Sequence, residues 1–261
     1  GRLPGPELAV IGYGSLGASA LGFNSDLDLI FLYQSVTSLS DGARPIPAER
    51  YHTGVTRRML SLMSANTPSG RLYSIDARLR PNGRAGLLVS SVDAFNRYQS
   101  EEAWVWELQS LTRARPVAGN AETAESFAAI RQRVLSMPRD KALISDEISA
   151  MRKRIRVEHK DSEPLKHGPG GLLDIEFVVQ LGLLLNANKF PGVLKSTQLA
   201  EQLLALRDCG WINTSVFKTL DNAYTQLSQA IQQAALIDDS TEVDTTALLD
   251  IAQALCEEIL G

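Results

Sequence analysis

The stretch from residue 7 to residue 33 reads ELAVIGYGSLGASALGFNSDLDLIFLY and contains two strand-like runs. The first, residues 7–14, is short and apolar, ends in Gly-x-Gly, and predicts a buried strand. Residues 27–33 alternate carboxylate with apolar side chains at their start and predict a second strand. Between them, residues 15–21 are small and apolar enough for a short helical turn. We therefore expect a strand, a tight turn and a second strand at the start of the chain.

Two carboxylates stand at the beginning of the second run. Strand residues two positions apart point to the same side, so Asp26 and Asp28 project together while Leu27 and Leu29 face the core. Carboxylates this close repel each other unless a cation lies between them. Mg²⁺ suits such a site because it binds oxygen ligands and keeps its other positions for water and phosphate.

A third carboxylate, Asp76, lies in the strand-like segment 71–80, RLYSIDARLR. Its apolar neighbours Ile75, Ala77 and Leu79 alternate with polar residues, as in a half-buried strand. If this strand lies beside the first carboxylates, the cluster of three has the form that holds two metal ions about 3.5–4 Å apart. An Asp-x-Asp pair alone is more often solvated or capping, whereas the joint pattern favours metal binding.

Residues around the carboxylates suit phosphate. Gly14 lets the backbone approach a phosphate closely, and Ser15 offers a hydroxyl and an N–H at a helix start. By the two-residue period, Arg78 and Arg80 share the strand face of Asp76, where they could grip a triphosphate. The simpler alternative is that the arginines only pair with the aspartates and that Gly-Ser is an ordinary turn.

The rest of the chain is mostly helix-like, which predicts an α+β fold with a small mixed sheet followed by a helical bundle. We expect a catalytic domain over 1–115 and a bundle over 116–261, with a polar break at 157–171. A loop is expected at 34–47 and a short strand at 87–89. Helices are expected over 48–65, 92–112, 120–136, 142–158, 172–188, 197–208, 212–234 and 245–260.

Composition excludes several classes of function. The 261 residues are 44% apolar and 21% charged, as in a globular protein. No apolar run approaches the roughly 18–20 residues of a membrane span, and Gly1–Pro6 does not resemble a signal peptide, so we expect no membrane partner and a cytoplasmic location. A net charge of −4 argues against nucleic-acid binding. The widely spaced Cys209 and Cys256 predict reduced thiols, and the histidines form no zinc motif.

The Gly-Ser pair, the Asp-x-Asp pair and the third strand aspartate together resemble the polymerase-β-type nucleotidyltransferase superfamily. Within that superfamily the chain is similar to glutamine synthetase adenylyltransferase. The strings that carry this resemblance are YGSLGASALGFNSDLDLIFLY (13–33), YSIDARLRPNGRAGLLVSS (73–91), YQSEEAWVWELQSLTRARPVAGN (98–120) and GGLLDIEFVVQ (170–180).

The resemblance implies a polymerase-β-like fold and a set of site residues. Asp26, Asp28 and Asp76 would be the catalytic metal ligands, holding two Mg²⁺ ions. Asp76 would act as the general base or as a bridge between the metals. The residues expected to bind ATP are Gly14, Ser15, Ser25, Arg78 and Arg80. The family usually has Gly-Lys-Leu-Gly-Gly where this chain reads GSLGA from Gly14, so a lysine–phosphate contact is in doubt. Ser15 restores the Gly-Ser of the wider superfamily, and we expect ATP binding to persist.

The family's enzyme has two related halves. One attaches AMP to a tyrosine of glutamine synthetase, and the other removes it by phosphorolysis. The strings DARLRPNGRAG and EEAWVWELQSLTRAR resemble the carboxy-terminal, adenylylating half, so the expected function is regulation of nitrogen assimilation by AMP transfer. Family likeness also implies regulation by a PII-type nitrogen-signal protein and glutamine. The alternatives are the AMP-removing reaction and a non-catalytic module that senses nucleotide or binds a partner.

Two further groups of residues have open interpretations. Asp174 and Glu176 begin a helix, where acidic side chains interact favourably with the helix dipole without any other role, although family likeness suggests that this helix faces the active site. Trp104, Trp106 and Glu107 either pack between the two domains or line the cleft for adenine or the protein substrate.

Overall fold

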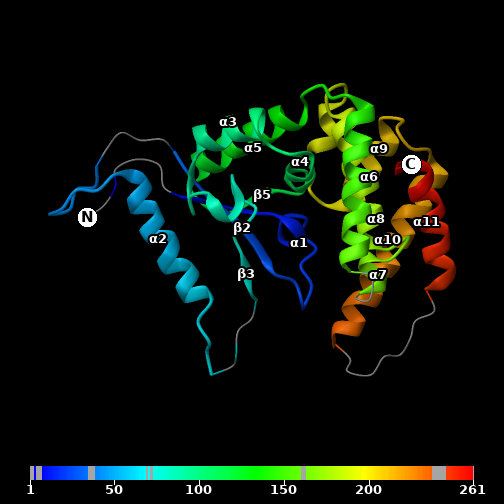
Figure 1. Cartoon of the computed structure of the whole chain (residues 1–261), viewed down its shortest axis with the longest axis horizontal. Helices are drawn as coiled ribbons and strands as arrows, with labels where there is room; N and C mark the ends of the chain where they lie inside the picture. The colour runs from blue at the N-terminus through cyan, green and yellow to red at the C-terminus, as the bar shows by residue number, and fades with distance from the viewer. Residues whose placement is uncertain are drawn as a thin grey trace. The chain divides into compact units, whose positions relative to one another are not determined.

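The computed structural model describes residues 3, 8–34, 39–68, 70, 73–159, 163–236 and 245–260. The chain forms two compact units, which divide between Val134 and Leu135 (Figure 1). The first unit contains the sheet and the second is helical, so the fold belongs to the α+β class.

The sheet of the first unit is mixed. Its main path runs in the order β3-β2-β1-β5, and β4 also pairs with β2. Strand β1 is antiparallel to β2 and to β5, whereas β3 and β4 both run parallel to β2. The strands are β1 (Ala9–Gly12), β2 (Leu27–Tyr33), β3 (Ile75–Asp76), β4 (Ser90–Ser91) and β5 (Arg115–Gly119). The two strands expected at the start of the chain are confirmed as β1 and β2. In place of the strand expected at 87–89, the structure has β4 immediately after those residues.

Strand β5 has no counterpart among the sequence predictions. Pro116 cannot donate to a ladder and Gly119 weakens a strand, so the segment does not look like one. In the structure it pairs with the outer edge of β1, with a register shift between Val10 and Ile11, and an edge position tolerates proline. The sheet therefore continues past residue 115, and the two compact units divide at the last residue of α5.

Helices flank the sheet in the first unit. The helix expected over 92–112 is interrupted, because the buried Glu107 accepts hydrogen bonds from the Trp104 N–H (2.9 Å) and the Tyr98 hydroxyl (2.9 Å) and starts a new helix. Phe95 and Phe127 join α3 to α5, with ring centroids 5.7 Å apart. The helices are α1 (Gly14–Gly17), α2 (Ala48–Met63), the 3₁₀ turn η1 (Gly83–Ala85), α3 (Val92–Glu101), α4 (Val105–Leu111) and α5 (Ala121–Leu135).

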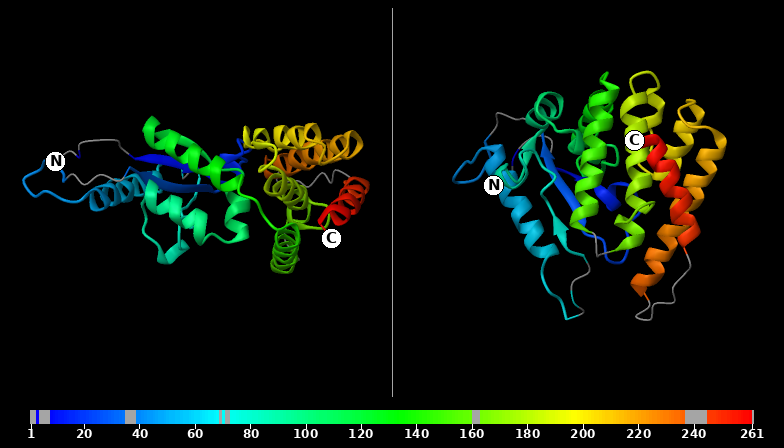
Figure 2. Two further views of the ribbon diagram at one scale, coloured as in Figure 1. Left: turned by 90° about the horizontal axis from the view of Figure 1, so that it is seen from above. Right: turned by 45° about the vertical axis from the view of Figure 1, so that its right-hand side comes forward.

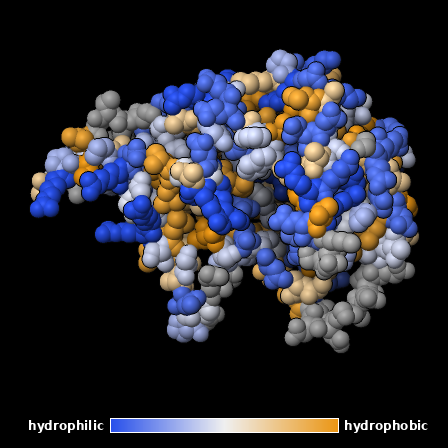
Figure 3. Space-filling view, viewed as in Figure 1, coloured by the Kyte–Doolittle hydropathy of each residue, from blue (hydrophilic) through white to orange (hydrophobic). Residues whose placement is uncertain are grey.

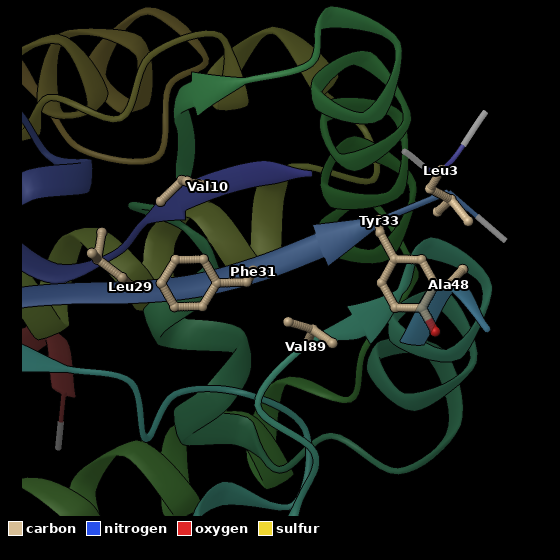
Figure 4. Close-up of a cluster of buried hydrophobic side chains, with 7 residues drawn as sticks. All are labelled: Leu3, Val10, Leu29, Phe31, Tyr33, Ala48 and Val89. Atoms are coloured by element: carbon tan, nitrogen blue, oxygen red, sulfur yellow. The ribbon is translucent and has the colours of Figure 1, made fainter. Parts of the chain in front are cut away.

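The alternating side chains of β2 set which face of the sheet is buried against α2. Leu29, Phe31 and Tyr33 point to one side and form a core cluster with Val10 and Val89 (Figure 4). Tyr51, Met59 and Leu60 of α2 pack against this cluster. Outside this contact, the exposed Val55 and Leu62 lie among arginines, and Figure 3 shows hydrophobic and hydrophilic side chains intermingled over this part of the unit.

The second unit is built around α8. This helix contacts α6, α7, α9, α10 and α11, which surround it in Figure 2. The stretch Pro164–Asn186 is long and apolar enough to cross a membrane, but 67% of its apolar window is buried inside the protein, as in a core helix. The elements are α6 (Lys141–Glu158), α7 (Pro164–His167), α8 (Leu172–Asn186), η2 (Pro191–Leu194), α9 (Leu199–Asp208), α10 (Thr214–Leu236) and α11 (Thr246–Leu260).

A buried ion pair joins α6 to α8. The carboxylate of Asp174 is 2% exposed. It accepts from Arg152 Nε (2.6 Å), from Arg152 Nη2 (2.8 Å) and from the Gly170 N–H (2.8 Å), and it also pairs with Arg156. This arrangement gives Asp174 a structural role within the second unit. The neighbouring Glu176 is only half-buried, and both cysteines, Cys209 and Cys256, carry free thiols, as expected.

Replacement of Asp174 should destabilise the second unit. Asp174→Asn leaves the buried Arg152 guanidinium without its counter-charge, which should cost about 3–5 kcal/mol of unfolding free energy. The exposed Arg207–Asp208 pair provides a control, and Asp208→Asn should cost about 0–1 kcal/mol. Denaturant unfolding of both variants measures the difference, and equal losses would contradict the structural role.

The effect of Asp174→Asn should depend on pH. Burial pushes the pKa of Asp174 upward, but the hydrogen bonds and charge of Arg152 outweigh it, so the pKa lies below its usual value. A depressed folded-state pKa gives stability that is fully present above the unfolded pKa of about 3.9. The difference between wild type and variant should therefore persist at neutral pH and shrink only in stronger acid.

Candidate active site

The structure brings the three predicted carboxylates to one end of the β2–β3 pair. In the parallel register Leu27 lies opposite Ile75, and Asp28 lies directly opposite Asp76. Residues opposite each other on neighbouring strands share a face of the sheet, so these two carboxylates project to the same side. Asp26, just before β2, accepts a hydrogen bond from the Ser74 hydroxyl just before β3. The expectation that the two strands are neighbours is confirmed.

Gly14 lies against the carboxylate of Asp28. Its φ is +52°, in the left-handed region, and a Cβ placed there would lie 2.2 Å from Asp28 Oδ2. The preceding N–H, that of Tyr13, donates to the Asp28 carbonyl (2.9 Å). Glycine is therefore required at this turn for its backbone conformation and for the space that Asp28 occupies.

Arg115 of β5 holds the C-terminal end of α1, the short helix that begins at Gly14. Its Nε donates to the Gly17 carbonyl (3.0 Å) and its Nη2 to the Leu16 carbonyl (3.2 Å). These are the last two carbonyls of α1, and that of Leu16 also accepts from the Ser19 N–H (3.2 Å). Sequence reasoning missed Arg115, because its role depends on the pairing of β5 with β1.

Of the two serines in the predicted nucleotide site, one lies in α1 and the other lies just before Asp26. Ser15 follows Gly14 in α1, and its carbonyl accepts from the Ala20 N–H (2.9 Å). Ser25 shapes the approach to Asp26, because its hydroxyl accepts from the Gly22 N–H (2.9 Å). Ser15 thus belongs to α1, and Ser25 belongs to the segment that leads from α1 to Asp26.

The arginines differ from the sequence prediction. Strand β3 ends at Asp76, so Arg78 and Arg80 lie in the following turn and do not continue its strand face. Arg78 folds back onto Asp76, with its backbone N–H 2.8 Å from Oδ1 and its Nε 2.6 Å from Oδ2. Arg80 instead donates to the carbonyls of Ala77 (2.5 Å) and Gly86 (3.3 Å) and holds the turn together.

Electrostatics distinguish the two opposed carboxylates. Burial, with added repulsion from Asp76 and Asp26, raises the pKa of Asp28 to about 6, despite the opposing charges of Arg113 and Arg78. The hydrogen bond from the Arg78 side chain lowers the pKa of Asp76 below its usual value. The charge of Asp76 is thus compensated by the Arg78 guanidinium. The pKa of Asp28 stays raised, because burial and the charges of Asp76 and Asp26 outweigh the arginines near it.

These donors fit a hard divalent cation in chemistry, since carboxylate oxygens are the ligands that Mg²⁺ prefers. Burial raises the pKa of Asp28 most, and a bound cation would offset the added repulsion from Asp76 and Asp26. As the side chains stand, no three acidic, histidine or cysteine groups in the described parts of the chain are placed to hold an ion together. Both oxygens of Asp76 are bonded to Arg78 in this arrangement.

The tryptophans near this region are exposed. Trp104 is 67% exposed and Trp106 37% exposed, whereas Glu107 is buried and caps α4. Glu107 therefore acts in packing and capping within the first unit.

Comparison with known proteins gives the family of this chain. Residues 2–130 match the family model described as glutamate-ammonia ligase adenylyltransferase. The bifunctional glutamine synthetase adenylyltransferase/adenylyl-removing enzyme of Xanthomonas campestris pv. campestris is 42% identical over 236 residues, which cover 88% of this chain and 25% of that protein. The chain belongs to the glutamine synthetase adenylyltransferase family.

Other members of the adenylyltransferase family match at similar levels. The bifunctional enzymes of Methylococcus capsulatus and Chromobacterium violaceum are 41% and 40% identical, over 88% and 97% of this chain and 25% and 28% of their own lengths. The chain therefore spans about a quarter of the length of these relatives. Residues 142–242, in the helical second unit, match the family model described as GlnD PII-uridylyltransferase.

A methyl group at Gly14 should disturb this site. Gly14→Ala places Cβ against Asp28 and strains the left-handed backbone, which should cost about 1–3 kcal/mol of unfolding free energy. Gly54→Ala in α2 is the matched control, because its Cβ meets nothing within 4 Å, and it should stabilise by about 0.5–1 kcal/mol. Chemical denaturation measures both, and a neutral Gly14→Ala would show that the turn does not need glycine.

Proposed function

We propose that the first unit transfers AMP from ATP to a tyrosine hydroxyl of glutamine synthetase in a reaction that requires Mg²⁺. The observation that carries this proposal is the register that sets Asp28 opposite Asp76, with Asp26 beside them and Gly14 against Asp28. Membership of the adenylyltransferase family supplies the reaction class and the protein substrate. A polymerase-β-like fold of this unit is part of the same proposal.

In this reaction the tyrosine oxygen attacks the α-phosphorus of ATP in line with the departing pyrophosphate. A new oxygen–phosphorus bond forms, the bond to the β-phosphate oxygen breaks, and the phenolic proton is lost. Asp26, Asp28 and Asp76 would hold the divalent cations. When bound, these supply charge stabilisation to the attacking oxygen and the leaving group. Of the two roles expected for Asp76, general base and metal bridge, we assign the second, because its position opposite Asp28 sets both carboxylates on one face of the sheet.

The residues around the carboxylates have separate roles in binding the nucleotide and the leaving pyrophosphate. Gly14 and Ser15 admit the phosphates close to the backbone of the α1 turn, and Ser25 shapes the segment that leads to Asp26. Arg78, whose side chain is 60% exposed, neutralises the leaving pyrophosphate. Arg80 contributes indirectly, because its guanidinium is bonded to the carbonyls of the turn that presents Arg78.

The direction of the reaction is open to a direct test, because the relatives are named as both adenylyltransferases and adenylyl-removing enzymes. We assign the adenylylating direction. If the chain instead catalyses removal, adenylylated glutamine synthetase and phosphate should yield ADP, while ATP and unmodified glutamine synthetase should yield no adenylylated protein.

The remaining assignments concern the longer enzyme. The helical second unit would help to dock glutamine synthetase, and a PII-type nitrogen-signal protein and glutamine would regulate the full-length protein in the cytoplasm. These assignments are supported by membership of the family. The chain itself spans about a quarter of the length of its relatives.

Replacement of Asp28 should abolish AMP transfer. Asp28→Asn removes the central carboxylate charge while preserving its shape, and we expect a loss of about 100-fold or more in kcat/KM. Asp93→Asn is the control, since it makes the same change at an exposed position in the first turn of α3 and should leave the rate unchanged. Mass analysis of glutamine synthetase after incubation with ATP and Mg²⁺ detects the added AMP.

The same assay separates the non-catalytic alternative. A module that only binds nucleotide or a partner would show no AMP transfer in the wild type. Its ATP affinity would be the same with and without Mg²⁺ and unchanged in Asp28→Asn. Retained transfer by Asp28→Asn would refute the assignment of the site.

A further inference from the structure

The ion pair between Asp76 and Arg78 occupies a carboxylate that the proposed reaction needs. Both oxygens of Asp76 are engaged, Oδ1 by the Arg78 N–H (2.8 Å) and Oδ2 by the Arg78 guanidinium (Nε at 2.6 Å). The opposed Asp28 instead has Gly14 against its Oδ2. The two carboxylates that face each other across β2 and β3 are therefore in different electrostatic states.

Arg78 and a divalent cation would compete for the same oxygens. The guanidinium and the cation are both positive, and each needs the Asp76 carboxylate as a direct partner. The side-chain oxygen Oδ2 faces the guanidinium, so a cation that takes it must displace Arg78. The displaced guanidinium then has no carboxylate partner and is ready to bind another anion.

We infer that Arg78 exchanges partners during ligand binding, pairing with Asp76 in the free protein and with the phosphates of ATP once a divalent cation holds Asp76. This inference rests on the proposed function and adds a coupling between its two ligands. Cation binding releases Arg78 for the nucleotide, and nucleotide binding withdraws Arg78 from Asp76. By linkage, each ligand raises the affinity of the other by the same factor.

The surroundings allow Arg78 to move while its neighbours stay fixed. Its side chain is 60% exposed, whereas that of Asp76 is 15% exposed. Arg78 is the exposed partner of the pair, so its guanidinium can leave Asp76 and remain in contact with solvent. Arg80 holds the same turn through the carbonyls of Ala77 and Gly86, so reorientation of Arg78 does not require the turn to unfold.

Mn²⁺ titration of the whole chain, followed by electron paramagnetic resonance, tests the exchange without relying on activity. In Arg78→Met, Asp76 no longer has a competing cation, and Mn²⁺ alone should bind roughly two- to fivefold more tightly than in wild type. Arg84→Met is the matched control. It removes a positive charge that acts on Asp76 from the same turn without belonging to the ion pair, and it should change Mn²⁺ affinity less.

A second titration in the presence of α,β-methylene-ATP measures the coupling. In wild type the nucleotide should tighten Mn²⁺ binding, and in Arg78→Met this enhancement should fall by a similar roughly two- to fivefold factor. Arg84→Met should keep the larger part of the enhancement. Thermal unfolding of each variant confirms that the exposed substitutions leave the fold intact.

The outcomes separate this inference from the proposed function. If Asp28→Asn abolishes Mn²⁺ binding but Arg78→Met binds Mn²⁺ no more tightly than Arg84→Met, the exchange is wrong and the metal site stands. If wild type binds no Mn²⁺ with or without the nucleotide analogue, or binds it equally well after Asp28→Asn, the metal site and the exchange both fail.

Discussion

The parallel pairing of β2 with β3 is the constraint on which the candidate site depends. It sets Asp28 opposite Asp76, and a slip of one residue would turn one of these carboxylates to the other face of the sheet. The apolar side chains that follow Asp28 in β2 prevent such a slip, because Leu29 and Phe31 are buried in the core cluster against α2. Hydrophobic packing on one face of β2 thus secures the position of charges at its beginning.

Holding the carboxylates together works against stability, since burial and then repulsion from Asp76 and Asp26 raise the pKa of Asp28. Two arginines support this site in different ways. Arg78 neutralises Asp76 directly and stays accessible to solvent, whereas Arg115 bonds only backbone carbonyls and keeps α1 in place beside Asp28. Arg78 therefore changes the charge of the site, and Arg115 fixes the backbone beside it.

Sequence periodicity was sufficient to identify β1, β2 and most helices, because each carries an apolar pattern several residues long. It also placed Asp28 and Asp76 in strands, since the two-residue period of a strand is a local property, whereas the adjacency of the two strands was only a condition of the prediction. It failed for Arg80 and for β5. The end of β3 at Asp76 is decided by the turn that follows, and the strand character of β5 arises only from its pairing with β1. Both depend on partners that a local pattern does not contain.

The pairing of β1 with β5 also affects how the first unit folds during synthesis. Ala9 of β1 is matched with Gly119 of β5, so the outer edge of β1 keeps its N–H and C=O groups unpaired until the chain has been synthesised past Gly119. Contacts between such distant segments form slowly, and open strand edges associate with other chains. Emergence of β5 from the ribosome is therefore the event that ends the nascent sheet's exposure to aggregation.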